Sequence, residues 1–343
     1  MFHKYPEIEN SYQQGFIDKI KEAGYENISY LITEKIHGSN SQVRYDMKEK
    51  TFSFGTRNNP LPDTDSHYHL RECIEPLKYK ITLIAEALSS DLAAIGQTLT
   101  AVTLYGEICG GSYPHPDVPK DKNAIKVQKG VFYSPSNQWY AFDIGYEIAH
   151  CERMFFLSGS KFTIFCQVAK IPTVPLLHSA PSLEEALEYP NNKTSYISEQ
   201  NNLPALESNI MEGVVIRPMY QDIWFGHTRL VLKNKNDTFK EKWKTKKAEP
   251  PEELSDKTKQ AIQEIAQYIH PNRVHNVISH IGEVTEKDIG KVIMLTSKDV
   301  LEDYNKEHDT LSCLEKKEEK AVNKYMNGEV AKLVRDIIIY KKQ

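Results

Sequence analysis

The sequence predicts an α+β protein of two domains, and three observations carry this prediction. Short runs of alternating polar and apolar residues, typical of strands half buried in a sheet, recur between residues 28 and 235. From residue 254 onward the apolar residues recur at three- and four-residue spacing, which is typical of helices. The pair Pro250-Pro251 separates the two patterns. We therefore expect a first domain over residues 1–247 and a small all-helical domain over residues 248–343.

The composition indicates a folded protein without a global affinity for nucleic acid. The 343 residues are 40% hydrophobic and 10% aromatic, which suits two domains with ample cores. The net charge of −4 requires that any polyanion site be a local concentration of positive charge. Five cysteines, odd in number and never at metal-ligand spacing, predict reduced thiols and no zinc site.

The chain shows no membrane or secretion signal. Its amino terminus lacks the apolar core of a signal peptide, and no run approaches the ~18 apolar residues of a membrane span. We expect a soluble cytoplasmic protein, located in the host cytoplasm if the gene is viral, with a mitochondrial location as the alternative.

The first predicted hairpin contains a candidate nucleophile. A strand over residues 28–33 leads to Lys35, and Gly38 permits a tight return into a strand over residues 42–45. The spacing Lys-x-x-Gly is weak evidence alone, because it recurs at Lys21 and at Lys287. The first recurrence fits the exposed face of a helix that stops at a glycine. The second fits the first turn of a helix after a Thr285/Asp288 capping box.

Further predicted strands each place a charged residue at or near one end. They cover residues 51–57, 100–107, 139–144, 211–218 and 229–235, and the charged residues are Arg57, Glu107, Asp143, Glu212, Lys233 and Lys235. Helices are expected over residues 68–88, 154–174 and 183–187. His67 and His69 fit an ordinary polar loop better than a metal site, and residues 113–135 fit a surface excursion.

A basic stretch follows the last charged strand. Residues 229–247 hold eight Lys or Arg against two acids, an excess of 8 − 2 = 6 positive charges. This concentration predicts a polyanion-binding segment, although a solvated linker would have the same composition. Beyond it, five helical stripes are expected, over residues 254–269, over residues 274–281, after Thr285, after Thr296 and over residues 322–338.

The charged strand ends suit a nucleoside triphosphate with magnesium. Lysine and arginine neutralise phosphate oxygens, and carboxylates hold a hard cation. A lysine attacks only as the neutral amine, a state that neighbouring positive charge favours. The combination therefore favours attack of Lys35 on a triphosphate, with departure of pyrophosphate.

Five short motifs in order carry a family resemblance: Lys35-Ile36-His37-Gly38, Gly106-Glu107, Phe142-Asp143, Glu212-Gly213 and Lys233-Asn234-Lys235. In this order they resemble the covalent nucleotidyltransferase superfamily of ligases and capping enzymes. Within it the chain resembles the double-strand (nick-sealing) RNA ligases of bacteriophages and of trypanosome RNA editing. The resemblance covers essentially the whole chain, including residues 272–292 of the helical domain, and it departs where Arg217-Pro218 replaces the frequent Lys-Pro of phage members.

The resemblance implies a nucleotidyltransferase domain of antiparallel sheets with flanking helices, and a role for each motif residue. Lys35 would carry AMP, assisted by His37, Lys233 and Lys235. Glu34 would select adenine, Phe142 would stack on the base and Glu107 would contact the ribose. The remaining implied nucleotide ligands are Ile36, Asn40, Arg57 and Glu212, and the implied metal ligands are Asp143 and Glu212.

The implied activity is that of an ATP-dependent RNA ligase sealing 3′-hydroxyl and 5′-phosphate ends, with nicks in duplex RNA or RNA/DNA hybrids as the expected substrate. It would act as a monomer with ATP and Mg²⁺, Mn²⁺ being the alternative metal. DNA ligases and capping enzymes are the weaker enzyme alternative, because they place a β-barrel where helical periods dominate here. A non-catalytic RNA-binding protein is the alternative of another class.

Overall fold

The computed structural model describes residues 2–240, 254–282 and 284–339. The chain forms two compact units, Met1–Thr238 and Phe239–Gln343. The predicted boundary at residues 247 and 248 lies outside the described residues and stays a prediction.

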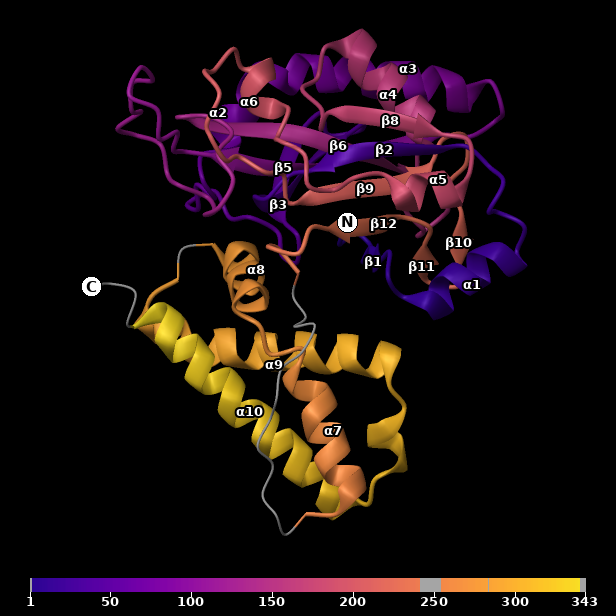
Figure 1. Ribbon diagram of the computed structural model, residues 1–343. Coiled ribbons are helices and arrows are strands. Elements are labelled where there is room, and N and C mark those ends of the chain that lie inside the picture. The colour runs from indigo at the N-terminus through magenta and orange to yellow at the C-terminus, as the bar shows by residue number, and fades with distance from the viewer. Residues whose placement is uncertain (1, 241–253, 283, 340–343) are drawn as a thin grey trace. The chain divides into compact units, whose positions relative to one another are not determined.

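The first unit contains two five-stranded sheets and a two-stranded ribbon (Figure 1). The first sheet has the order β1 (Glu9–Asn10), β12 (Leu232–Lys235), β9 (Gly213–Pro218), β2 (Tyr30–Lys35) and β8 (Leu176–Ala180). The second sheet has the order β4 (Phe52–Thr56), β3 (Ser39–Asp46), β5 (Leu99–Gly110), β6 (Asn137–Ile148) and β7 (Phe155–Phe156). The ribbon pairs β10 (Trp224–Phe225) with β11 (Thr228–Arg229). Apart from the parallel β1–β12 pair, the named strands pair antiparallel, which confirms the α+β prediction.

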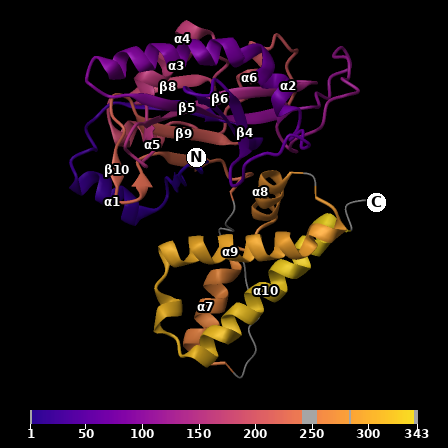
Figure 2. The same cartoon turned by 180° about the vertical axis from the view of Figure 1, so that it is seen from behind.

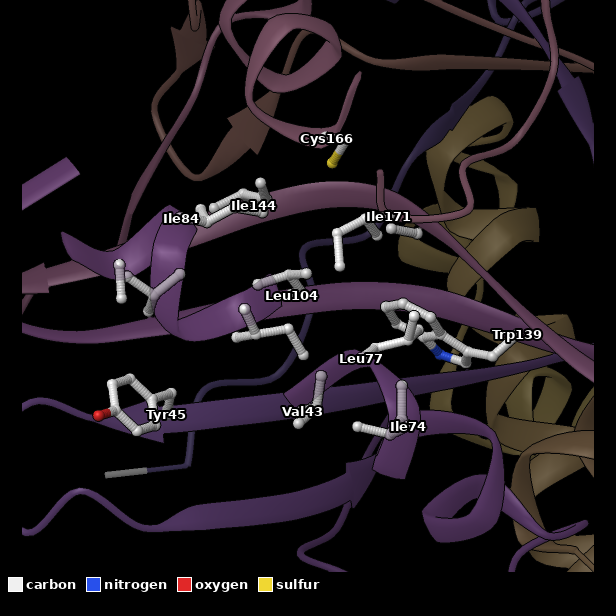
Figure 3. Close-up of a cluster of buried hydrophobic side chains, with 14 of the residues drawn as sticks. Val43, Tyr45, Ile74, Leu77, Ile84, Leu104, Trp139, Ile144, Cys166 and Ile171 are labelled. Atoms are coloured by element: carbon white, nitrogen blue, oxygen red, sulfur yellow. The ribbon is translucent and has the colours of Figure 1, made fainter. Parts of the chain in front are cut away.

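Helices cover the second sheet because each strand turns its alternate apolar residues to one face. The helices of the unit are α1 (Gln14–Glu22), α2 (Leu70–Ile74), the 3₁₀ turn η1 (Glu75–Leu77), α3 (Lys78–Ala93), α4 (Gly159–Ala169), α5 (Leu183–Glu188) and α6 (Ile197–Gln200). Val43, Leu104 and Ile144 of three neighbouring strands pack with Ile74 and Ile84 of the helices (Figure 3). This core fixes the strands whose opposite face carries the site.

The first sheet has its own core, which α1 and α5 cover. Ile17 and Ile20 of α1 and Leu183 of α5 are buried with the sheet residues Ile32 and Ile216. The helix α1 ends before Gly24, whose φ is +76°, so the helical interpretation of the Lys21 motif is confirmed.

Two predicted elements of this unit differ from the structure. The sequence predicts one helix over residues 154–174, but the segment begins with the edge strand β7, and α4 follows it. Ser158 caps α4 by accepting a hydrogen bond from the Lys161 N–H. The predicted strand 229–235 is broken into β11 and β12 at Leu230-Val231, both buried. Hydrophobic content alone did not separate an edge strand from the helix that follows it.

The second unit is helical over its described residues, as predicted. It contains α7 (Asp256–Ala266), α8 (Pro271–Ile281), η2 (Glu286–Asp288), α9 (Ile289–Glu307), η3 (Thr310–Cys313) and α10 (Lys316–Ile338). The capping box of Thr285 and Asp288 is present. The predicted third and fourth helices are one helix, α9, because Thr296 lies inside it with a buried side chain and does not cap a new helix.

Figure 2 shows the same helices from behind. Among the described residues, no helix is both long and apolar enough to span a bilayer.

Candidate active site

The turn after β2 joins the two sheets of the first unit. Lys35 ends β2 opposite Gly213 of β9, and Asn40 of β3 lies opposite Glu107 of β5. Gly38 is required between them, because a Cβ atom there would lie 2.2 Å from the Ile108 carbonyl oxygen. The turn therefore brings the ends of strands from both sheets to the same place.

Glu212 is the centre of a group of basic side chains at this turn. Its carboxylate lies 2.8 Å from Lys35 Nζ, 3.0 Å from Lys235 Nζ and 3.5 Å from His37 Nδ1. Burial raises the pKa of Glu212, but Lys235 and Lys35 outweigh burial and hold the pKa well below its usual range. Glu212 is therefore an anion that holds the two lysines together. Lys233 precedes Lys235 by two residues in β12 and projects from the same face.

Glu107 is a second carboxyl group beside the turn. Its Oε1 accepts a 3.2 Å hydrogen bond from the Gly38 N–H. Burial raises the pKa of Glu107 to about 8, against the opposing effects of Lys35 and Arg57. The Asn40 side-chain oxygen beside it is buried and has no hydrogen-bond partner among the described residues. An unsatisfied buried amide is unfavourable alone, so this position suits a polar ligand.

Glu34 and Ile36 flank Lys35 on the buried side. Glu34 is 1% exposed and accepts hydrogen bonds from the Ser195 hydroxyl at 2.6 Å and the Tyr196 N–H at 2.9 Å. Burial raises the pKa of Glu34 to about 7. The sequence analysis did not predict that Ser195 and Tyr196 hold this carboxyl group. Adenine selection by Glu34 stays a prediction.

Asp143 lies in a buried ion network. Its Oδ2 accepts hydrogen bonds from the Tyr5 hydroxyl at 2.8 Å and from Arg229 Nη1, and its Oδ1 accepts one from Arg217 Nη2 at 3.2 Å. A metal ion here would have to replace an arginine and would be repelled by the other. The predicted metal role of Asp143 does not fit this geometry, and a structural role does.

Arg229 also corrects the sequence interpretation of the basic stretch. It is 2% exposed and paired with Asp143 and Asp222, so it cannot contribute to a polyanion-binding surface. The later lysines of the stretch, residues 242–247, lie outside the described residues.

Phe142 occupies an irregularity in β6. Tyr105 pairs with Asp143 and Gly106 pairs with Ala141, so Phe142 is the extra residue of a bulge. Its carbonyl accepts a 3.2 Å hydrogen bond from Arg217, and its ring centroid lies 5.0 Å from that of Tyr5. Stacking of Phe142 on a base stays a prediction.

The predicted surface excursion contributes to the site. Tyr133 is 1% exposed and its hydroxyl accepts a 2.7 Å hydrogen bond from the His37 N–H. Gln128 Nε2 donates to the Gly38 carbonyl at 3.3 Å. Three apolar residues within this polar segment could have revealed the anchoring. They are Val127, Val131 and Tyr133, and all three are buried.

His67 also lies against the turn, although the sequence pattern indicated an ordinary loop residue. Its Nε2 lies 3.3 Å from the Ser39 hydroxyl, and burial lowers the pKa of the imidazole. Over the described residues, no group of three or more His, Cys, Asp or Glu side chains is placed to hold a metal ion.

Two family models match the chain. The model described as RNA ligase matches residues 28–240, and the model described as T4 RNA ligase 2 C-terminal matches residues 251–332. These matches, over residues that contain the ordered motifs, define the class of the protein as a ligase. Because the first model covers more than half of the sequence, the chain belongs to the RNA ligase family. This confirms the predicted family and disfavours a DNA ligase.

Several known proteins are similar to this chain. Mitochondrial RNA-editing ligase 2 of Trypanosoma brucei brucei is 31% identical over 159 residues, which are 43% of this chain and 37% of that protein. Mitochondrial RNA-editing ligase 1 of the same organism is 24% identical over an alignment of 357 positions, covering 86% of this chain and 74% of that protein. An RNA ligase of Naegleria gruberi is a structural neighbour with 15% identity and a TM-score of 0.44, over 69% of this chain and 57% of that one.

Proposed function

We propose that the protein is an ATP-dependent RNA ligase in which Lys35 carries AMP between ATP and an RNA 5′-phosphate. The observation that carries the proposal is the position of Lys35, whose Nζ lies 2.8 Å from a buried carboxylate that also binds Lys235 and His37. Membership of the RNA ligase family and similarity to two RNA-editing ligases support it.

In the first step the Lys35 amine attacks the α-phosphorus of ATP. A nitrogen–phosphorus bond forms, the bond to the β-phosphate oxygen breaks, and pyrophosphate leaves. The triphosphate displaces Glu212 from both lysines: Lys235 exchanges the carboxylate for phosphate oxygens, and Lys35 loses its proton to solvent and attacks as the neutral amine. Displacement at phosphorus depends mainly on positioning and charge neutralisation, which these residues and Arg57 supply.

The site also suits a divalent metal. Glu212, once released by the lysines, and Glu107, once deprotonated, would offer oxygen ligands of the kind that Mg²⁺ and Mn²⁺ prefer. Held by these residues, a divalent metal would supply positive charge against the phosphates. Asp143, whose oxygens are engaged by two arginines, is not part of this proposed set.

Two further displacements complete the reaction. An oxygen of the RNA 5′-phosphate attacks the AMP phosphorus, and the bond to Lys35 breaks to release the amine. The 3′-hydroxyl then attacks the activated 5′-phosphorus, which joins the strands and releases AMP.

We assign nicks in duplex RNA or RNA/DNA hybrids as the substrate, with the protein acting as a monomer in the cytoplasm. Ligation compared side by side on nicked duplex, hybrid and single-stranded RNA tests the substrate assignment.

The covalent intermediate gives a direct test. Incubation with Mg²⁺ and ATP labelled at the α-phosphate is expected to leave a label on the polypeptide, and Lys35→Ala removes it. Lys21→Ala and Lys287→Ala are matched controls, because both lysines have the same spacing to a glycine but lie in α1 and η2. Both controls should keep the label, and label that survives Lys35→Ala contradicts the proposal.

A further inference from the structure

The loop between β5 and β6, residues 112–136, is fixed to the turn that carries the nucleophile. Gln128 donates to the Gly38 carbonyl, and Tyr133 accepts from the His37 N–H. Val127 and Val131 are buried, so the segment between these anchors cannot drift away from the site. The loop extends beyond the ends of β5 and β6 (Figure 1). Residues 127–133 are therefore fixed to the turn that contains Lys35.

The exposed side of this loop has uncompensated positive charge. Its four exposed lysines are Lys120, Lys122, Lys126 and Lys129. Within the part of the chain that the structure describes, none of the four forms an ion pair with a carboxylate. The two acids of the loop are engaged locally, because Asp117 lies beside His115 and Asp121 accepts a hydrogen bond from the Asn123 N–H.

Two of these lysines lie close enough to repel each other. Partial burial, together with the positive charge of Lys129, lowers the pKa of Lys126. The Lys126 ammonium lies 5.2 Å from the centre of the Phe132 ring, which gives it a weak cation–π partner in place of an anion. Neighbouring cations without a carboxylate are unfavourable alone and become favourable when a polyanion binds.

The reaction supplies two phosphate-bearing ligands, ATP and RNA. The lysines are spread along ten residues, from Lys120 to Lys129, which matches an extended phosphate backbone better than one triphosphate. We propose that residues 118–132, the lysine loop, bind the phosphate backbone of RNA next to the ends that are joined. The inference rests on the proposed ligase function and adds to it a surface that positions the RNA beside the lysyl-AMP.

The test uses the full chain with all four lysines of the loop changed to Gln. The matched control is Lys19→Gln with Lys21→Gln, which removes exposed charge from α1, at the opposite end of the unit in Figures 1 and 2. Binding is measured with a labelled nicked RNA duplex whose 3′ end lacks the hydroxyl, so that sealing cannot occur. Lysyl-AMP formation with ATP and Mg²⁺ is measured separately, without RNA.

We expect the loop variant to bind the nicked duplex about tenfold or more weakly at low salt. The slope of log affinity against log salt concentration should become less steep by about 1 for each lysine that contacts a phosphate. Lysyl-AMP formation should match that of the unchanged protein, and the α1 control should bind RNA with an unchanged slope. A K126Q/K129Q pair should give about half of the effect.

Three outcomes overturn the inference. RNA affinity and slope equal to those of the α1 control would show that the lysines do not contact RNA. A raised KM for ATP with unchanged RNA binding would assign them to the triphosphate. Slower lysyl-AMP formation with unchanged RNA binding would make the loop only a support for the turn. Failure of the unchanged protein to form lysyl-AMP would instead sink the proposed function, so the two failures are distinguishable.

Discussion

The His37 N–H donates a 2.7 Å hydrogen bond to the hydroxyl of Tyr133, a fully buried side chain 96 residues further along the chain. This bond joins the turn that contains Lys35 to the loop between β5 and β6. Lys35 is held by Glu212 through its side chain, and His37 is held both by Glu212, which lies 3.5 Å from its Nδ1, and through its backbone N–H. The position of the nucleophile therefore depends on residues outside the five motifs.

Tyr133→Phe should slow lysyl-AMP formation. The ring still fills its site, but the His37 N–H loses its acceptor, which costs about 1–3 kcal/mol for a buried donor. We expect a roughly tenfold lower rate at saturating ATP, equivalent to about 1.4 kcal/mol, with little change in KM. Single-turnover labelling with ATP measures both.

Tyr30→Phe is the matched control for this change. Tyr30 is also fully buried, and its hydroxyl donates a 2.6 Å hydrogen bond to the Tyr25 carbonyl away from the turn. It should lower the free energy of unfolding without slowing lysyl-AMP formation. Equal rate losses in both variants would indicate general destabilisation and no positioning by Tyr133.

Asp143→Asn should destabilise the first unit. The change leaves Arg217 and Arg229 buried without their shared carboxylate, which costs about 3–5 kcal/mol when a buried pair is broken. Urea unfolding of the protein without nucleotide or metal measures the loss. Unchanged stability together with a raised Mg²⁺ requirement would restore the metal role that the sequence predicted for Asp143.

Glu107 predicts a pH dependence of stability. Burial raises its pKa to about 8 in the folded protein, from an ordinary value near 4.5. Between these values the folded state binds a proton that the unfolded state has lost, so the free energy of unfolding falls as the pH rises. Glu107→Gln mimics the protonated form and keeps the acceptor for the Gly38 N–H.

The stability of this variant relative to the unchanged protein should therefore increase by at least about 1 kcal/mol between pH 5 and pH 8.5. Urea midpoints across this range measure it. Glu212 does not obscure the effect, because its lowered pKa contributes stability that is lost only below its ordinary value of 4.5. A constant difference between variant and unchanged protein would refute a buried, protonated Glu107.

Gly38→Ala should disrupt the turn. The new methyl group would lie 2.2 Å from the Ile108 carbonyl oxygen and 2.9 Å from Glu107 Cγ, so β3 and β5 must separate locally at a cost of about 1–3 kcal/mol. Lysyl-AMP formation should fall sharply. Gly15→Ala in α1 is the control, because nothing lies within 4 Å of its added methyl group and stability should be kept or slightly raised.

Most strands and helices could be predicted from the sequence because they have clear periods or caps. Ser182 begins α5 and Thr285 forms a capping box, as local patterns indicated. The edge strand β7 and the continuity of α9 could not be predicted in this way. Phe155 and Phe156 suit a helix or a strand equally, and Thr296 resembles a cap until its burial among other helices is known.

The charged residues of the site could be predicted from the sequence, but the residues that pair with some of them could not. Glu212 lies with Lys35 and Lys235, residues whose strand-end positions could be found from alternation. The arginine partners of Asp143 could not be found, because Arg217 and Arg229 reach it from β9 and β11 and their burial depends on the packing of the sheets. Tyr133 was missed because the buried apolar residues Val127, Val131 and Tyr133 follow neither a helical nor a strand period.

The pairing of Lys35 with Glu212 has a consequence for the empty enzyme. An amine engaged with a carboxylate at 2.8 Å is shielded from stray electrophiles, and the partner that shields it also binds Lys235. In the proposed reaction, Glu212 would occupy the place of the triphosphate, keep Lys35 and Lys235 in position and lower the reactivity of the Lys35 amine. Amine-reactive reagents should therefore modify Lys35 slowly without ATP. The Lys35 amine would become reactive only when ATP binds and displaces Glu212.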